Sequence, residues 1–264
     1  MLIAVEYLGS VGVGATSPQF FRADDDNIYV VKLQNNRLGP KVLANEFVAA
    51  RLGKLMNLCF PRSDIIQMSE QGLKKKQGPM TPAISPGRHF ASLYLDNTEY
   101  VGKHNLHQAI NKTEMAGVLL FDHLFHNADR ANNKKNLLLR REETGCKIYA
   151  IDHSHLFRTG RWTLESLADL SSRIKPYYRH SFGILLKDYL SSQDFLPYVE
   201  KVGTINNKDI EKIMEEIPEE WLPNQLERQG LTHHITLRCA MAHKIFDILC
   251  DYIPQTRGGY RWLF

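Results

Sequence analysis

The sequence has 264 residues, of which 43% are hydrophobic and 23% charged, with 33 Lys and Arg against 29 Asp and Glu. This composition is typical of one large folded domain or two small lobes, and it excludes a disordered tail, a fibrous repeat and a disulfide-stapled miniprotein. The formal net charge of +4 is weaker than the clustered basic excess of duplex-binding proteins, so a nucleic-acid partner is disfavoured.

Neither the cysteines nor the first residues indicate secretion. The four cysteines lie far apart without a C-x-x-C pair, which argues against a disulfide framework and a zinc knuckle. The N-terminus has no basic region and reaches Glu6 after a short apolar run, unlike a signal peptide. No apolar run approaches the roughly 18 residues that a membrane span requires. We therefore expect a cytoplasmic protein without a membrane span.

The chain begins with an apolar run from Leu2 to Leu8, followed by a loop of small residues at 9–18. Two β-prone runs, at 20–23 and 28–33, flank an Asp-rich turn, which predicts a hairpin. Apolar residues at helical spacing predict a helix over 43–56.

Two further strands are predicted at 64–68 and 90–95, joined by an exposed connection from Gly72 to Gly87. The second half is mostly helical. It contains an apolar helix over 115–126 and an amphipathic helix that starts behind an Asn207 cap.

A second hairpin interrupts these helices, with its strands at 136–139 and 147–151. We therefore expect an α+β fold, with a β-rich N-lobe over 1–98 and a mainly helical C-lobe over 99–264.

Two charged residues in the first half stand out by position. Lys32 ends the apolar strand Tyr29-Val-Val-Lys32, where a charge is rare unless its tip has a partner. Glu46 lies fourteen residues further on, within the predicted helix. Taken singly, each is explained more simply, as a lysine snorkelling from an edge strand and a solvated helix carboxylate.

Polar residues gather on either side of the second hairpin. The connection from His126 to Asn136 holds one carboxylate, Asp129, among amides and cations, and Asp152 follows the strand that ends at Ile151. Each alone could serve only a local turn.

The order of these features is more informative than any one of them. A glycine-containing hairpin, a strand Lys, a helix Glu, an Asp–loop–Asn connection and a second Asp follow one another along the chain. Phosphoryl transfer from Mg-ATP needs such a set, because backbone amides and a Lys bind phosphates while an Asn and an Asp hold the metal. The order therefore predicts a two-lobed kinase.

These motifs resemble the HipA-like kinases. The residues that carry the resemblance are the run from Gly9 to Pro18, Tyr-Val-Val-Lys32, Asn-Glu46, Asn-Ala-Asp129-Arg and Ile-Asp152-His. The chain looks like a short stand-alone branch without an extra N-terminal domain, and Ile217-Pro-Glu-Glu-Trp221 is similar to that branch too. The Asn-x-Asp-Arg signature is also similar to the phosphoinositide 3- and 4-kinases.

The resemblance implies a bilobal protein-kinase-like fold that uses ATP and Mg²⁺, with a protein hydroxyl as acceptor. It implies that Lys32 contacts phosphates and pairs with Glu46, and that Asp129 is the catalytic base. Asp152 would bind metal. The residues that would bind the nucleotide are Gly12 and Gly14 in the phosphate loop, and Leu93, Tyr94 and Leu95 as the hinge.

The sequence departs from the family pattern at the metal-binding Asn. That residue usually lies five positions after the catalytic Asp, where this chain has Lys134. Asn133 and Asn136 flank the position, and we favour Asn136 because it directly precedes the apolar strand. The altered spacing leaves a nucleotide-binding pseudokinase as an alternative to an active enzyme, and a lipid kinase as a variant.

Overall fold

The structure is a computed structural model that describes residues 1–70, 84–176, 186 and 188–251. Its N-terminal part is a five-stranded barrel of β1 (Leu2–Ser10), β2 (Gln19–Ala23), β3 (Ile28–Lys32), β5 (Gly87–Leu93) and β4 (Ser63–Met68), paired in that order. All neighbours are antiparallel except β1 and β4, which close the barrel in parallel. The predicted hairpin forms β2 and β3.

A second sheet starts the C-terminal part. It joins β6 (Thr98–Tyr100), β7 (Leu137–Glu142) and β8 (Gly145–Ala150), all antiparallel. The remaining elements of this part are helices: α3 (Met115–Leu124), α4 (Ala128–Asn132), α5 (Leu164–Ser172), α7 (Ser192–Thr204), α8 (Asn207–Glu216), α9 (Gln225–Ala240) and α10 (Ala242–Cys250). Three short 3₁₀ turns cover Leu106–Gln108, Lys112–Glu114 and Lys134–Asn136.

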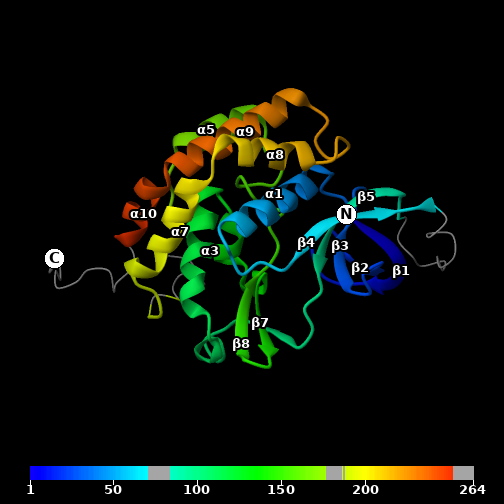
Figure 1. The fold of residues 1–264 in the computed structure, drawn as a ribbon, viewed down its shortest axis with the longest axis horizontal. Coiled ribbons are helices and arrows are strands. Elements are labelled where there is room, and N and C mark those ends of the chain that lie inside the picture. The colour runs from blue at the N-terminus through cyan, green and yellow to red at the C-terminus, as the bar shows by residue number, and fades with distance from the viewer. Residues whose placement is uncertain (71–83, 177–185, 187, 252–264) are drawn as a thin grey trace.

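Helix α1 (Lys41–Leu55) lies between the barrel and the helices (Figure 1). Its apolar residues, among them Leu43, Phe47 and Leu52, are buried in the larger of two cores, which also contains most of the C-terminal helices. The barrel has its own smaller core. Burial of large apolar side chains stabilises a fold by about 2 kcal/mol each, so these residues anchor α1 firmly in the larger core.

The segment after α8 makes a second set of contacts between the barrel and the helical part. Trp221 is buried, packs against Phe47 and donates its indole N–H to the Arg88 carbonyl on β5 (3.0 Å). The Arg88 guanidinium pairs with Glu220 (Nε–Oε1 2.7 Å). The orientation of the barrel relative to the helices is thus fixed by specific polar contacts.

The α+β prediction, with a β-rich N-terminal region and a helical C-terminal part, is confirmed. Two details were wrong. Asn206 rather than Asn207 caps α8, because its side chain accepts from the Asp209 amide (3.2 Å). The strand predicted over 90–95 ends at Leu93, since the chain leaves the barrel there. Most of the connection predicted over Gly72–Gly87 lies outside the described residues.

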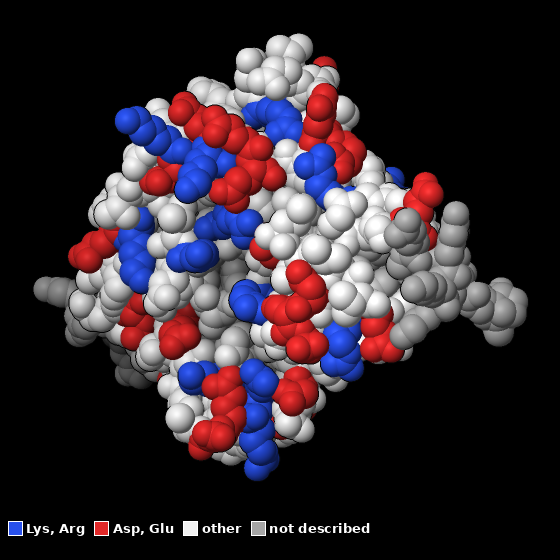
Figure 2. All heavy atoms as spheres, turned by 45° about the vertical axis from the view of Figure 1, so that its right-hand side comes forward, with Lys and Arg blue, Asp and Glu red and all other residues white. Residues whose placement is uncertain are grey.

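Within the described residues no helix is both long enough and apolar enough to cross a membrane. On the face drawn in Figure 2, Lys and Arg side chains alternate with Asp and Glu, and neither sign forms a continuous field. This face therefore carries no extended patch of a single charge sign.

Candidate active site

A cleft of about 520 Å³ lies between the barrel and the β7–β8 hairpin. Its walls come from the loop after β1, from β3 and α1, from the link after β5, and from residues 133–153. Most of the predicted site residues line it: Gly14, Lys32, Glu46, Leu93, Tyr94, Leu95, Asn136 and Asp152. The fold thus brings together residues that are up to 138 positions apart in sequence, from Gly14 to Asp152.

Lys32 is the centre of a buried polar cluster in this cleft. Its ammonium donates to Glu46 Oε1, to Asp152 Oδ1 (2.8 Å) and to Ser154 Oγ (2.8 Å). Only 10% of the Lys32 side chain and 4% of the Glu46 side chain are exposed. The three N–H groups of the ammonium therefore all have acceptors, and the snorkelling explanation for Lys32 does not hold.

The cluster keeps its members ionised. Burial by itself would raise the pKa of Glu46, but the Lys32 ammonium outweighs it and holds that pKa below its ordinary value. Burial would likewise raise the pKa of Asp152, but the Lys32 ammonium outweighs burial and holds that pKa far below its ordinary value. Burial would lower the pKa of Lys32, yet Asp152 and Glu46 raise it above its ordinary value.

Asp152 presents one carboxylate oxygen to the cleft. Its Oδ1 accepts from Lys32, from the Ser154 hydroxyl (2.6 Å) and from the Ser154 amide (3.2 Å). Its Oδ2 has no hydrogen-bond donor among the described residues. The backbone at Asp152 is left-handed (φ 59°), a conformation that non-glycine residues rarely adopt and that is often found at functional sites.

Asp129 lies on the first turn of the short helix α4 and is bonded to Asn136, whose Nδ2 donates to Asp129 Oδ2 (2.7 Å). Because Nδ2 is used in this way, the Asn136 Oδ1 remains as an acceptor or metal ligand. Asn133 also lines the cleft, but its Oδ1 accepts from the Lys135 amide (3.1 Å) within the 3₁₀ turn. Of the two asparagines, Asn136 is the one directed toward Asp129.

The loop between β1 and β2 contains two glycines in left-handed conformations, Gly12 (φ 79°) and Gly14 (φ 103°). Any other residue would be strained there. Gly14 lines the cleft, whereas Gly12 is not among the lining residues. Arg37 supports the loop from outside by donating to the Ala15 carbonyl (2.6 Å).

The predicted hinge follows β5 at one end of the cleft. The amides of Leu93 and Tyr94 donate to the carbonyls of Arg62 (2.8 Å) and Ile28 (2.9 Å), so both are used within the barrel. The Leu95 amide has no acceptor among the described residues. A hinge contact through backbone donors is therefore restricted to Leu95.

Several residues of the site are not among the predicted site residues. Ser154 joins the Lys32 cluster, and Val30 on β3 and Leu138 on β7 add apolar walls to the cleft. His155 Nδ1 lies 4.0 Å from Asp129 Oδ2. Only the proximity of Ser154 and His155 to Asp152 in sequence could have drawn attention to them.

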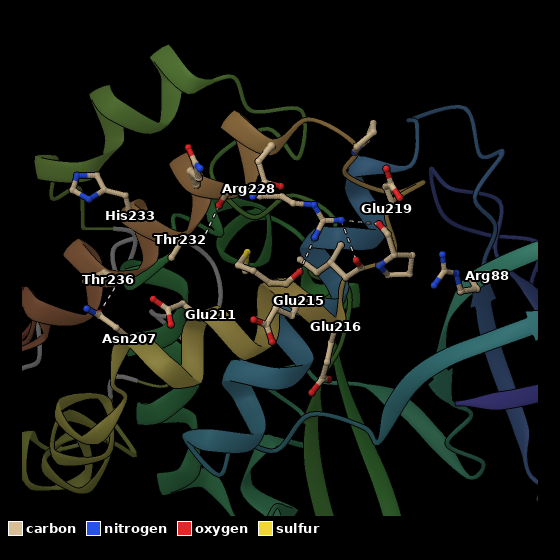
Figure 3. Close-up of a pocket in the computed structure, with 16 residues that line it drawn as sticks. Arg88, Asn207, Glu211, Glu215, Glu216, Glu219, Arg228, Thr232, His233 and Thr236 are labelled. Carbon is tan, nitrogen blue, oxygen red and sulfur yellow. Dashed lines mark hydrogen bonds between the residues drawn. The ribbon is translucent and has the colours of Figure 1, made fainter.

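A second and larger cavity, of about 870 Å³, lies between α8, α9 and residues 217–223 (Figure 3). Arg228 projects from α9 into it and donates to the carbonyls of Met214 (2.6 Å), Ile217 (3.0 Å) and Leu222 (2.7 Å). These carbonyls lie at and beyond the end of α8, where a helix leaves its carbonyls without partners. The predicted site residues do not line this cavity, and Arg228 has a structural role there.

A barrel with a Lys on its third strand, a Glu on the helix that follows, and an Asp–Asn loop and a second Asp across a cleft make up a kinase-like fold. A family model described as HipA-like kinase matches residues 4–246. The chain therefore belongs to the HipA-like kinase family, and the resemblance seen in its motifs is confirmed.

Solved structures support the fold. The proinflammatory kinase CtkA of Helicobacter pylori is similar with a TM-score of 0.61 and 13% identity, over 94% of this chain and 97% of that chain. A structure of hydra Fam20 with sugar is similar with a TM-score of 0.51 and 12% identity, over 96% of this chain and 88% of that chain.

A Golgi casein kinase crystallised with Mn and ADP is similar with a TM-score of 0.51 and 9% identity, over 94% and 73%. A search among curated proteins gives no match. At these identities the solved structures establish a kinase-like fold.

Proposed function

We propose that this protein is an ATP-dependent kinase that transfers the γ-phosphoryl group to a Ser or Thr hydroxyl of a protein, with Mg²⁺ as the metal. The observation that carries the proposal is the buried Lys32–Glu46 pair, which shares the cleft with Asp152 and the glycine loop. Transfer through a loose, metaphosphate-like transition state depends mainly on positioning and charge neutralisation, and this cleft supplies both.

The oxygen donors in the cleft fit a magnesium ion. The free Oδ2 of Asp152 and the Oδ1 of Asn136 are hard ligands of the kind that Mg²⁺ takes, with its remaining positions filled by phosphates and water. When bound, the metal would neutralise charge on the phosphates. A related fold that was crystallised with Mn and ADP supports a nucleotide and a divalent metal here too.

Lys32 would bind the α- and β-phosphates while Glu46 keeps it oriented. Since its three N–H groups already have protein acceptors, at least one contact has to be exchanged when phosphates bind. We propose that the Asp152 contact is exchanged, because a metal at Asp152 would take over that carboxylate's charge. Asp129 would orient the acceptor hydroxyl and receive its proton.

The glycine loop would cover the phosphates with the amides around Gly12 and Gly14. Adenine would lie between Val30 and Leu138, which line the cleft together. In that position the Leu95 amide would donate to a ring nitrogen.

We also retain residues 1–98 and 99–264 as the two lobes. In support, β5 ends at Leu93 and β6 of the second sheet begins at Thr98, so the change from one sheet to the other falls within a few residues of this boundary. A cytoplasmic location is proposed as well. It is supported by the four free thiols, Cys59, Cys146, Cys239 and Cys250, which are typical of a reducing compartment.

The test is phosphoryl transfer from labelled ATP with Mg²⁺ to a generic acceptor protein such as casein and to the chain itself, followed by phosphoamino-acid analysis. We expect labelled Ser or Thr from the wild type and a loss of about 100-fold or more for Asp129→Ala, which retains Mg·ADP binding. Asp152→Ala should lose the Mg²⁺ dependence of ADP binding.

Equal labelling by the wild type and both variants would contradict the mechanism. Binding of Mg·ADP by the wild type without labelling would identify a pseudokinase, the alternative that the long loop between Asp129 and Asn136 keeps open.

A further inference from the structure

Arg130, the residue after Asp129, is fully buried although its guanidinium is always charged. Its Nε donates to both carboxylate oxygens of Asp122 on α3 (2.9 and 3.3 Å), and neither side chain is more than 3% exposed. A buried charge is costly unless it is paired and hydrogen-bonded. Nη2 has no partner among the described residues, so Nε and Nη1 carry all the hydrogen bonds of the guanidinium.

The Nη1 of Arg130 donates to two main-chain carbonyls, those of Asn136 (2.9 Å) and Ile151 (2.6 Å). Asn136 carries one proposed metal ligand, and Ile151 immediately precedes Asp152, which carries the other. The Ile151 amide in turn donates to the Asn136 carbonyl (3.0 Å). One guanidinium nitrogen thus joins the two backbone segments from which the metal ligands project.

Asp122 anchors this arrangement to α3. Besides Arg130, it accepts from the Asn127 side chain (Nδ2–Oδ1 2.9 Å), and its carbonyl accepts from the Asn127 amide (2.8 Å). Asn127 lies two residues before Asp129. The start of the loop, its end at Asn136 and Ile151 just after β8 are therefore all bonded to the same buried ion pair.

We propose that Arg130 is a positioning residue that sets the spacing between Asn136 and Asp152, and with it the affinity of the site for a divalent metal. The inference rests on the proposed function for the identity of the ligands. The forked shape of the guanidinium is required, because a lysine ammonium can keep the charge beside Asp122 but does not present the same planar set of donors.

Arg238 provides a matched control. It is likewise fully buried and donates to carbonyls, those of Leu124 (2.7 Å), His123 (2.8 Å) and Arg173 (2.9 Å). These carbonyls belong to the end of α3 and to the segment after α5, neither of which carries a proposed ligand. Arg238→Lys should therefore destabilise the fold, because it too removes hydrogen bonds from a buried guanidinium to main-chain carbonyls. It should not act directly on the metal site.

The experiment compares the wild-type chain, Arg130→Lys and Arg238→Lys in two measurements. The first is the Mg²⁺ concentration that gives half-maximal ADP binding. We expect it to rise about tenfold or more in Arg130→Lys, as for other residues that support metal ligands, and to stay near the wild-type value in Arg238→Lys. The second is amide hydrogen exchange without nucleotide or metal, in which Ile151 should lose protection in Arg130→Lys alone.

The outcomes separate the two proposals. If the wild type shows no metal-dependent nucleotide binding, the proposed function fails, whereas faster exchange at Ile151 still establishes the positioning role for the backbone. An unchanged Mg²⁺ requirement together with unchanged exchange in a folded Arg130→Lys overturns the positioning role. If Arg130→Lys does not fold, the paired replacement Asp122→Leu with Arg130→Met removes both charges, and it should show the same two changes.

Discussion

The Asn136 side chain donates to Asp129 over 2.7 Å, across a loop two residues longer than the family spacing. The extra length is taken up by the 3₁₀ turn Lys134–Asn136, in which Asn133 caps the Lys135 amide. Asn136 therefore lies beside Asp129 although it is seven residues further along the chain.

This relationship predicts different effects for the two asparagines. Asn136→Ala should raise the Mg²⁺ concentration for half-maximal ADP binding by about tenfold or more, because it removes a proposed metal ligand. Asn133→Ala should leave it nearly unchanged and lower only stability, by about 1 kcal/mol for the lost turn contact. A reversed pattern in an Mg²⁺ titration would assign the ligand to Asn133.

Lys32→Met should abolish nucleotide use and also lower stability. Removing the ammonium leaves Glu46 and Asp152 close together without their cation, a change that costs about 3 kcal/mol at buried pairs. The double variant Lys32→Met with Glu46→Gln should recover much of the stability but no nucleotide binding. Urea unfolding and ADP calorimetry measure the two effects.

Lys41→Met is the control for that series. Lys41 also forms an ion pair, with Glu227 (2.8 Å), but it does not line the cleft. The Lys41→Met variant should therefore be less stable than the wild type but should bind nucleotide with the same affinity. Nucleotide binding by Lys32→Met at the wild-type affinity would show that Lys32 has a purely structural role.

Ser154→Ala should impair phosphoryl transfer, with only a small loss in the free energy of unfolding. The hydroxyl lies within 3.0 Å of Lys32, Glu46 and Asp152, and it helps to hold Asp152 so that Oδ2 faces the cleft. We expect a stability loss of about 1 kcal/mol and a higher KM for Mg·ATP. In Ser171→Ala, which removes a hydroxyl bonded to the Leu167 carbonyl (2.7 Å), only stability should change.

The buried histidines predict a loss of stability in mild acid. Burial lowers the pKa to about 4 for His89, His123, His153 and His234, and to about 3 for His126. Between pH 6.5 and 4 the unfolded chain therefore binds more protons than the folded one. The free energy of unfolding should then fall as the pH falls through this window, by up to about 1.4 kcal/mol per pH unit for each histidine.

Denaturant unfolding at a series of pH values measures that slope. His89→Gln should make it shallower, since one buried imidazole no longer takes part. His104→Gln, at a side chain that is 75% exposed, should leave it unchanged. Equal slopes for the wild type and His89→Gln would show that His89 does not contribute to the loss of stability in acid.

The sequence alone determined most of the N-terminal strands, the helix that follows them and the order of the site residues. Apolar alternation marked the strand that ends at Lys32, and helical spacing marked the helix that carries Glu46, because both patterns follow from local backbone geometry. The order of Lys32, Glu46, Asp129 and Asp152 was enough to predict a kinase, because each residue lies on a predicted element or in a connection beside one.

The tertiary structure decided the contacts between distant segments. Lys32 meets Asp152 across 120 positions, and Arg130 bonds the Asn136 and Ile151 carbonyls only because α3 holds Asp122 beside it. No local preference encodes such contacts, since they depend on how the two cores close around the cleft. For the same reason only the folded chain distinguishes Asn136 from Asn133 and brings Ser154 into the cluster around Lys32.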